Sequence, residues 1–216
     1  MKNTLYVLNT EELKDKYIYE YWYDKMPLYR REKTDFFMFE KDKRLSLAAG
    51  ILLKKALDEH NVEDRDILCG KNGKPYLKDK KLHFNISHSE NMAVCAVSDR
   101  VVGVDTEKVH IFEEGLINFV FHKEEIDCIR KNYADPDEGF TFLWTVKESA
   151  MKYFGTGLAL EPKGISVDMA GRVRAYCEGY NSDALYFTRY NIEGYVLTVC
   201  SEYEMFTEDH KQVRLS

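Results

Sequence analysis

The sequence predicts an α+β fold, in which a long helix is followed by a run of short antiparallel strands. Residues 42–60 carry apolar side chains at helical spacing, with Asp42 at the N-terminal end. Strand patterns follow at 82–87, 92–98 and 101–107, and short polar turns join them. This order indicates an antiparallel meander beside a helix rather than a parallel sheet.

The other expected elements continue the mixture of helices and strands. In chain order, they are a strand at 2–8, a Tyr-rich helix at 11–23, a turn-rich loop at 69–79, helices at 122–132 and 139–154, and strands within 164–203. Gly155 and Gly157 are expected to end the second of the later helices. The segments NMAVCAVSD (91–99) and GYVLTVCSE (194–202) look alike, which is a faint indication of two similar halves.

Length and composition favour a globular cytoplasmic protein. A chain of 216 residues suits one large domain or two small halves packed as one body. No apolar run approaches the roughly 18 residues that a membrane span needs, and the N-terminus shows no secretory signal. The five Cys are odd in number and widely spaced, so we expect free thiols rather than disulfides or a zinc site.

Positive charge gathers in two segments of an acidic chain. The net charge of −6 argues against a nucleic-acid partner. Residues 25–55 nevertheless carry nine Lys or Arg against four Asp or Glu, and residues 71–81 carry five Lys against one Asp. Such segments suggest a localised anion site, although a solvated Lys-rich surface gives the same pattern.

A pair of acidic residues marks a candidate metal site. Asp105 and Glu107 are two apart on an expected strand, so both carboxylates point to one face. Two carboxylates held this close repel each other and need a proton or a cation. Oxygen ligands alone suit Mg²⁺, which often shares a phosphate of the substrate. The alternative is an exposed strand end with two solvated acids.

A helical segment offers a third carboxylate and a lysine. Trp144, Glu148 and Lys152 are spaced four residues apart and share one face of the expected helix. Glu148 would complete a three-carboxylate site, and Lys152, one turn further on, would meet a phosphate held there. The alternative is an ordinary Glu–Lys pair on the protein surface.

The turn-rich loop and the strand after it offer phosphate contacts. In the Gly-Lys-Pro sequence, the turn at Lys74 and Pro75 holds an ammonium group in place. Ser87 and His88 lie where a strand ends, and they present hydroxyl, imidazole and backbone donors. Together these groups suit a phosphate, although a turn lysine and a hairpin histidine also occur with no ligand.

These motifs follow one another in an order that resembles the 4′-phosphopantetheinyl transferase superfamily. The order is Gly-Lys-Pro, Phe-Asn-Ile-Ser-His-Ser, Gly-Val-Asp-x-Glu and Trp-x-x-Lys-Glu-Ser-x-x-Lys, within residues 71–160. The chain is most similar to the Sfp-like branch, whose single chains activate carrier proteins of nonribosomal peptide and polyketide synthases. The resemblance implies a pseudo-dimeric α+β fold of two similar halves, each with a small antiparallel sheet and a long helix. We expect residues 1–103 to contact the CoA nucleotide, and residues 104–216 to hold the metal and dock the carrier.

The resemblance also implies roles for individual residues. The expected Mg²⁺ ligands are Asp105, Glu107 and Glu148. The expected CoA contacts are Arg44, Lys74, Pro75, Ser87, His88, Asp105 and Lys152, with Lys152 at the pyrophosphate and Arg44 at the 3′-phosphate or adenine. The expected catalytic residues are Glu148, Lys152 and Glu125, the last resembling an acidic residue proposed as a base. Arg30, Arg31 and Lys33 are further basic candidates that the sequence does not separate.

The implied activity is Mg²⁺-dependent transfer of 4′-phosphopantetheine from CoA to a serine of an acyl or peptidyl carrier protein, releasing 3′,5′-ADP. Positive charge from Mg²⁺ and Lys152 would neutralise the charge that develops on the phosphates. Glu148, Glu125 or a bound water molecule would take the serine proton. Proteins of this branch are usually monomeric, and we expect a monomer with no nucleic-acid or membrane partner.

An apolar segment is a candidate carrier contact, and two other functions remain as alternatives. Residues 111–121 are unusually apolar for a connection, so we expect part of this segment to contact the carrier, with Phe112 and Ile117 as positions to test. The alternative is that they pack in the core. The rival functions are a non-catalytic protein that binds CoA or a carrier, and a metal-dependent nucleotide phosphohydrolase that uses water as acceptor.

Overall fold

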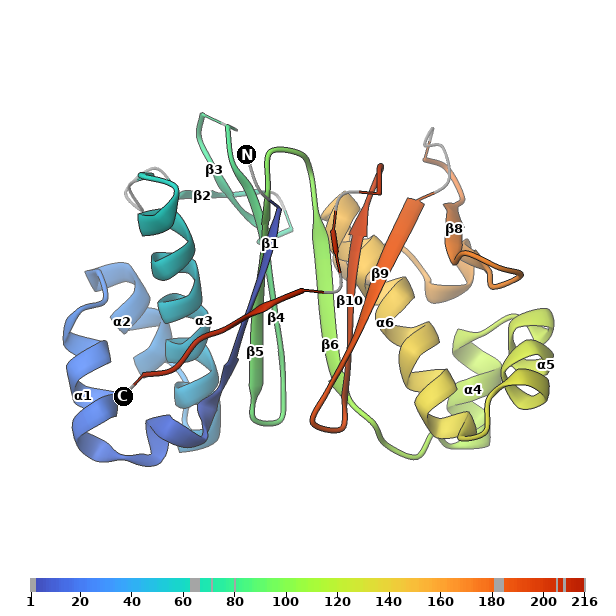
Figure 1. The fold of residues 1–216 in the computed structure, drawn as a ribbon, viewed down its shortest axis with the longest axis horizontal. Helices are drawn as coiled ribbons and strands as arrows, with labels where there is room; N and C mark the ends of the chain where they lie inside the picture. The colour runs from blue at the N-terminus through green and yellow to red at the C-terminus, as the bar shows by residue number, and fades with distance from the viewer. Residues whose placement is uncertain are drawn as a thin grey trace.

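Two sheets lie side by side, and each packs its outer face against one long helix (Figure 1). The computed structural model describes residues 3–62, 67–70, 72–79, 81–180, 185–204, 206–207 and 209–215. The layers therefore run helices, sheet, sheet, helices across the molecule. This arrangement confirms the predicted α+β class and its two similar halves.

The first sheet has the strand order β11-β1-β5-β4, and the elements of its half come mostly from the first hundred residues. They are β1 (Thr4–Asn9), the 3-10 helix η1 (Thr10–Lys14), α1 (Lys16–Asp24), α2 (Leu28–Asp35), α3 (Glu40–Glu59), β2 (Ile67–Cys69), β3 (Pro75–Leu77), β4 (His83–Ser89) and β5 (Met92–Ser98). Strands β2 and β3 form a separate two-stranded sheet, in which β3 lies inside the segment expected to be a loop and β2 ends at the first residue of that segment. Helix α2 was not predicted, because its sequence LYRREKTD has no apolar period.

Helix α3 is the helix expected at residues 42–60, and it begins two residues earlier. Its apolar face packs on the sheet through buried side chains, among them Leu47, Ile51 and Leu52. Burying a side chain of this size stabilises the fold by about 1.5–3 kcal/mol relative to leaving it exposed. The periodicity therefore predicts both the helix and the face that it buries.

The second sheet has the order β6-β10-β9-β8-β7. The elements of this half are β6 (Gly103–Lys108), α4 (Glu114–Val120), α5 (Lys123–Asn132), α6 (Pro136–Phe154), the 3-10 helices η3 (Gly157–Ala159) and η4 (Pro162–Gly164), β7 (Ile165–Asp168), β8 (Arg174–Cys177), β9 (Leu185–Ile192) and β10 (Tyr195–Ser201). Helix α6 starts after Asp135, whose side chain accepts from two backbone N–H groups of the first turn. It ends at Gly155, which has a left-handed φ of 69°.

The two halves meet along β4 and β6. An apolar cluster, including Leu5, Val94 and Leu197, fills the space between the inner faces of the sheets. Side chains at alternate positions of β4 then join the strands, because Asn85, Ser87 and Ser89 contact β6 at Val104, Asp105 and Glu107 respectively. The seam between the halves therefore runs past the expected metal ligands.

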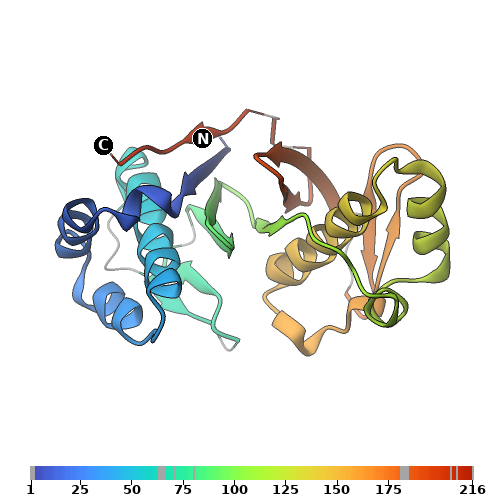
Figure 2. The ribbon, with the colours of Figure 1, turned by 90° about the horizontal axis from the view of Figure 1, so that it is seen from below.

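The C-terminal segment does not stay with the second half. Strand β11 (Lys211–Gln212) crosses back and pairs in parallel with β1, beside Tyr6 and Val7 (Figure 2). The expected division at residue 103 therefore matches no clean boundary of the sheets, because the tail covers the free edge of β1. Among the described residues, no helix combines the length and the apolar character needed to cross a membrane.

Candidate active site

Asp105 is the centre of the site, on β6 at the seam between the halves. Its side chain is 2% exposed, and its Oδ1 atom accepts from the Ser87 hydroxyl at 2.8 Å and from the Lys152 ammonium at 2.5 Å. Lys152 also donates to Ser87 Oγ at 2.8 Å. The three side chains come from β6, β4 and α6, so the site forms only when the two halves pack together.

The other oxygen of this carboxylate has no partner. Asp105 Oδ2 is buried without a hydrogen bond in the structure. The pKa values of Glu107 and Glu148 are raised, first by burial and then by the Asp105 charge. Glu107 also accepts from Ser89 at 2.7 Å. A buried, unsatisfied carboxylate oxygen beside two further acids is an environment that favours a cation.

The acids are close enough to influence one another electrostatically, but they are not arranged as a finished metal centre. Within the described ranges, no three His, Cys, Asp or Glu side chains are gathered at metal-binding distances. Lys152 supplies the positive charge at Asp105 instead. The donor set of three carboxylates is of the kind that Mg²⁺ takes, and the orphaned Oδ2 atom fits such an ion.

Gly103 is what allows β6 to lie this close to α6. A Cβ atom at this position would sit 2.0 Å from the Ser149 carbonyl oxygen and 2.6 Å from the Tyr153 backbone nitrogen. No side chain fits there, because both contacts are with backbone atoms. The glycine therefore sets the approach that brings Asp105 to Lys152.

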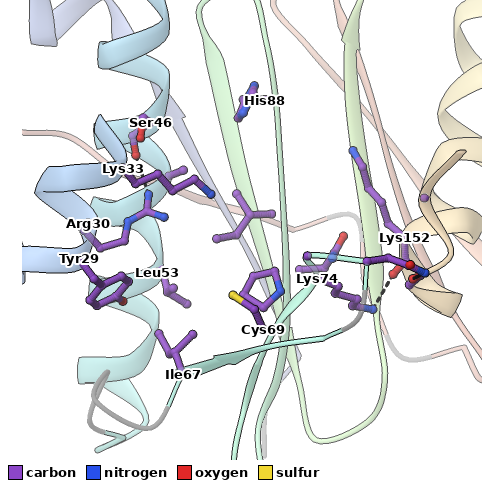
Figure 3. A pocket seen from close by; sticks show the side chains of 18 of the residues that line it. Tyr29, Arg30, Lys33, Ser46, Leu53, Ile67, Cys69, Lys74, His88 and Lys152 are labelled. Carbon is purple, nitrogen blue, oxygen red and sulfur yellow. Dashed lines mark hydrogen bonds between the residues drawn. The ribbon is translucent and has the colours of Figure 1, made fainter. Parts of the chain in front are cut away.

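A cavity of about 380 Å³ opens beside Lys152 (Figure 3). Its walls come from α2 and α3 on one side, β4 in the middle, and β2, β3 and the C-terminal end of α6 on the other. Lys152 of α6 faces the cavity from the second half, and His88 of β4 faces it from the seam between the halves. Desolvation by burial and the nearby Lys152 ammonium lower the pKa of His88.

The opposite wall of the cavity carries two cations, Arg30 and Lys33 of α2 (Figure 3). Arg30 is 8% exposed, and its buried Nε atom has no hydrogen-bond partner. Burial lowers its pKa, and burial together with the Arg30 charge lowers the pKa of Lys33. Arg31 does not line the cavity. The structure thus separates the basic candidates that the sequence left together.

The Lys74 ammonium has a different role from the expected phosphate contact. It donates to the carbonyl oxygens of Lys152, Tyr153 and Val102 at 2.5, 3.0 and 3.3 Å. Burial lowers the pKa of Lys74 to about 8. The stem of Lys74 and the ring of Pro75 still line the cavity. The Gly-Lys-Pro turn therefore fastens the first half to the C-terminal end of α6 and shapes the wall.

Arg44 is not among the residues that line the cavity. Ser46, Ala49 and Leu53 are the residues of α3 that line the cavity. Arg44 is two residues before Ser46, and about 200° of helix rotation separates their side chains. Burial raises the pKa of Tyr19 in α1 to about 12, and the nearby Arg44 charge opposes that rise. Contact of Arg44 with CoA therefore stays a prediction.

Comparison with known proteins places the chain in a family. Residues 18–100 match the model "4′-phosphopantetheinyl transferase, N-terminal", and residues 101–200 match that of the 4′-phosphopantetheinyl transferase superfamily. The 4′-phosphopantetheinyl transferase ffp of Bacillus subtilis is 30% identical over 187 residues, or 83% of this chain and 84% of the relative. The chain belongs to the 4′-phosphopantetheinyl transferase superfamily.

Two further relatives place the transferase in the Sfp-like branch. The transferase Sfp of Bacillus subtilis strain 168 is 30% identical over 83% of this chain and 84% of its own length. The transferase gsp of Aneurinibacillus migulanus is 30% identical over 77% of this chain and 72% of its own length. A solved holo-[acyl-carrier-protein] synthase of Thermotoga maritima aligns over 46% of this chain and 60% of its own, with 15% identity and a TM-score of 0.38. The assignment rests on the sequence relatives.

Glu125, the third expected catalytic residue, lies in a separate buried environment of the transferase. One oxygen accepts from the backbone N–H of His122 at 2.8 Å and pairs with Lys147 at 2.9 Å, and the other accepts from the backbone N–H of Val167. Both oxygens are therefore occupied within the second half. The structure does not bring Glu125 to Asp105, and its contacts are those of a structural residue.

Lys147 is a structural residue that the sequence analysis missed. Its side chain is fully buried and donates to the carbonyl oxygens of Val120, Pro162 and Ile165, besides pairing with Glu125. It thereby ties α4, α5, η4 and β7 to the middle of α6. The available signal was that this lysine is four residues from both Leu143 and Met151, and so lies on an apolar face of the expected helix.

The apolar segment 111–121 splits between core and surface. Phe112 and Ile117, the positions expected to test carrier contact, are 7% and 4% exposed and belong to the core. Ile111, Leu116 and Phe119 are instead exposed, at 81%, 45% and 71%. Residues 114–120 form α4 rather than a connection, so only one face of the segment is free.

Proposed function

We propose that this transferase moves the 4′-phosphopantetheine group of CoA to a serine of an acyl or peptidyl carrier protein and releases 3′,5′-ADP. The observation that carries the proposal is a single cavity with two groups of positive charge on opposite walls, Lys152 on one and Arg30 with Lys33 on the other. CoA has two separate anionic groups, its pyrophosphate and its 3′-phosphate. The charge pattern of the cavity matches that of the ligand.

The pyrophosphate belongs at the wall that carries Lys152, whose ammonium pairs with the buried Asp105. Lys152 gives an ammonium donor, and Ser87 and His88 stand beside it on β4. The 3′-phosphate belongs at Arg30 and Lys33, where a desolvated guanidinium has an unused N–H. A charged ligand oxygen there would make a charge-assisted hydrogen bond, the stronger class.

Asp105, Glu107 and Glu148 are the residues that would hold Mg²⁺. The unpartnered Oδ2 atom of Asp105 and the raised pKa values of the two glutamates support this assignment. A bound Mg²⁺ supplies positive charge against the negative charge that develops on the transferring phosphate.

The transfer exchanges the phosphoanhydride bond of the CoA pyrophosphate for a phosphate ester bond to serine. The serine oxygen bonds to the β-phosphorus, and the bond from that phosphorus to the bridging pyrophosphate oxygen breaks, so that 3′,5′-ADP leaves. Lys152 stabilises the charge on the departing side. We assign the serine proton to Glu148. Burial and the Asp105 charge raise the pKa of Glu148, against the opposing charge of Lys152, and a raised pKa suits a proton acceptor.

The carrier would dock on the exposed face formed by Ile111, Leu116 and Phe119. This face follows β6 directly in the chain, so it is connected to the strand that carries Asp105. Exposed apolar residues gathered on one short segment are typical of an interaction site. Both walls of the cavity come from one chain, which supports a monomeric transferase.

Product analysis tests this function against its closest rival. The transferase should form 3′,5′-ADP from CoA only when an apo carrier protein is present, as measured by chromatography of the nucleotides. A nucleotide phosphohydrolase would release products from CoA and Mg²⁺ alone. Nucleotide release at the same rate without a carrier would overturn the proposal.

A further inference from the structure

Arg30 lies against the one residue of α3 that has no side chain. Gly50 is the only glycine of this helix. A Cβ atom at Gly50 would sit 3.0 Å from Arg30 Nε, 3.2 Å from Arg30 Nη2 and 3.0 Å from Met26 Sδ. Glycine is among the poorest residues for a helix interior, and φ at Gly50 is not positive. The backbone of α3 therefore gives no reason for a glycine here, whereas the space that Arg30 occupies does.

A hydrogen bond to the backbone of α3 fixes the Arg30 guanidinium. Arg30 Nη2 donates to the Ser46 carbonyl at 2.7 Å. Helix geometry directs the N–H of Gly50 to the same carbonyl, four residues back. The Ser46 hydroxyl is engaged with Thr34 of α2 at 3.0 Å, which fixes the two helices to each other. Arg30 thus lies flat across α3 at the turn between Ser46 and Gly50.

In this position Arg30 has a buried donor without a partner, and no described carboxylate balances its charge. Its Nε atom is buried without a partner, and no carboxylate pairs with Arg30 among the residues that the structure describes. An unpaired buried guanidinium is unfavourable unless an anion completes it. The cavity that Arg30 lines is the place from which such an anion would come.

We propose that Gly50 is a positioning residue that holds Arg30 in place for the 3′-phosphate and so sets the preference for CoA over 3′-dephospho-CoA. The inference rests on the proposed function, which places the 3′-phosphate at Arg30. Gly50 itself needs no contact with the ligand. A side chain at position 50 displaces the guanidinium from α3 and misaligns the donor, and the misalignment grows with the size of the side chain.

Direct binding measurements test the proposal without relying on turnover. Dissociation constants for CoA and for 3′-dephospho-CoA are measured by titration calorimetry on wild type, Gly50→Ala, Gly50→Val, Arg30→Gln and the Gly50→Val/Arg30→Gln double variant. The two ligands differ only in the 3′-phosphate, so 3′-dephospho-CoA is the matched control for every protein. Thermal unfolding of each variant establishes that it is folded, and Gly50→Ala has the better helix former at this position.

The expected result is a selective loss. Gly50→Val should weaken CoA binding by about tenfold, the scale of one hydrogen bond to a charged group, and leave 3′-dephospho-CoA unchanged. Gly50→Ala should show a smaller loss in the same direction. In the Arg30→Gln background, Gly50→Val should have no further effect on CoA binding, because the two residues act through one contact.

Three results would overturn the proposal, and they separate it from the proposed function. Equal weakening of both ligands by Gly50→Val would show that the side chain deforms the cavity. A full additional effect of Gly50→Val in the Arg30→Gln background would show that it acts elsewhere. Equal affinity of wild type for the two ligands would remove the 3′-phosphate assignment and leave the transferase activity unaffected. Failure of wild type to bind CoA at all would instead contradict the proposed function.

Discussion

The Lys152 ammonium lies 2.5 Å from Oδ1 of Asp105, and it leaves Oδ2 of the same carboxylate buried and unpartnered. One side of the carboxylate thus faces a lysine from α6, and the other has a free lone pair in a setting with two more acids. An arrangement of this kind suits a carboxylate that binds a cation on one side and shares a phosphate-binding lysine on the other. The Asp-x-Glu motif and the helical Glu148–Lys152 motif, which first indicated the site, therefore meet at the contact between Lys152 Nζ and Asp105 Oδ1.

The close approach of β6 to α6 makes Gly103 sensitive to the smallest substitution. Gly103→Ala places a Cβ atom 2.0 Å from the Ser149 carbonyl oxygen, so β6 must move away from α6. We expect the free energy of unfolding to fall by about 3 kcal/mol, at the upper end for overpacking, with a drop in kcat because Asp105 moves with its strand. Denaturant unfolding measures the first effect. Gly115→Ala is the stability control, since no atom lies within 4 Å of its Cβ; equal stability of the two variants would contradict the account.

The sequence predicted the elements that local pattern determines. The apolar period of α3 predicts its position and buried face, and the spacing of Asp105 and Glu107 predicts that they share a face of β6. The sequence did not predict the partners of Lys74, because the carbonyl groups that it binds belong to residues 28 to 79 positions away. A turn lysine looks the same in sequence whether it meets a phosphate or the end of a helix.

Arg44 is a different case, because its contact with CoA stays a prediction. Its face of α3 follows from helical geometry once the cavity-lining residues are known, but the sequence alone does not say which face of α3 meets the ligand. Arg30, in turn, lies on a helix without an apolar period, so local pattern carried no signal for its position. Both outcomes depend on how α1 and α2 pack on α3.

The three acids should make the effect of Mg²⁺ on stability depend on pH. The pKa values of Glu107 and Glu148 are raised in the folded protein, so their contribution to stability is present at low pH and is lost as pH rises through those values. Mg²⁺ binds the ionised forms and relieves that loss. Mg²⁺ should therefore raise Tm more at about pH 7.5 than at about pH 5.

Thermal unfolding with and without Mg²⁺, with EDTA as the control, measures this dependence. Asp105→Asn should remove most of the stabilisation at the higher pH, because it takes away the central carboxylate. A Tm increase that is the same at both pH values, or that survives in Asp105→Asn, would place the cation elsewhere.

The buried pair of Glu125 and Lys147 should matter for folding and not for chemistry. Lys147→Met leaves the Glu125 carboxylate buried without its cation, and we expect the free energy of unfolding to fall by about 3–5 kcal/mol. Glu125→Gln should lower stability while the folded enzyme keeps its kcat. Denaturant unfolding and steady-state kinetics measure the two quantities. Loss of kcat in a stably folded Glu125→Gln variant would restore Glu125 as a catalytic base.

The exposed face of residues 111–119 should affect the carrier and not CoA. Phe119→Ser and Ile111→Ser remove apolar surface that is 71% and 81% exposed, so folding should tolerate them. We expect the KM for the carrier to rise by about fivefold or more, with the KM for CoA unchanged. Tyr176→Ser is the matched control, an exposed aromatic residue on β8. An unchanged carrier KM in both variants would move the docking surface elsewhere.

Intact-mass spectrometry of an apo carrier protein detects the transfer of phosphopantetheine itself. The carrier is incubated with CoA and the wild-type transferase with Mg²⁺, with EDTA in its place, or with Asp105→Asn and Mg²⁺. We predict that the carrier gains the mass of one phosphopantetheine with wild type and Mg²⁺ and gains nothing with EDTA. Asp105→Asn should lower the rate by about 10²–10³-fold, as loss of a key charge in a transition-state site does. Modification of the carrier at the wild-type rate by Asp105→Asn, or no modification by a wild-type protein that binds CoA, would contradict the account.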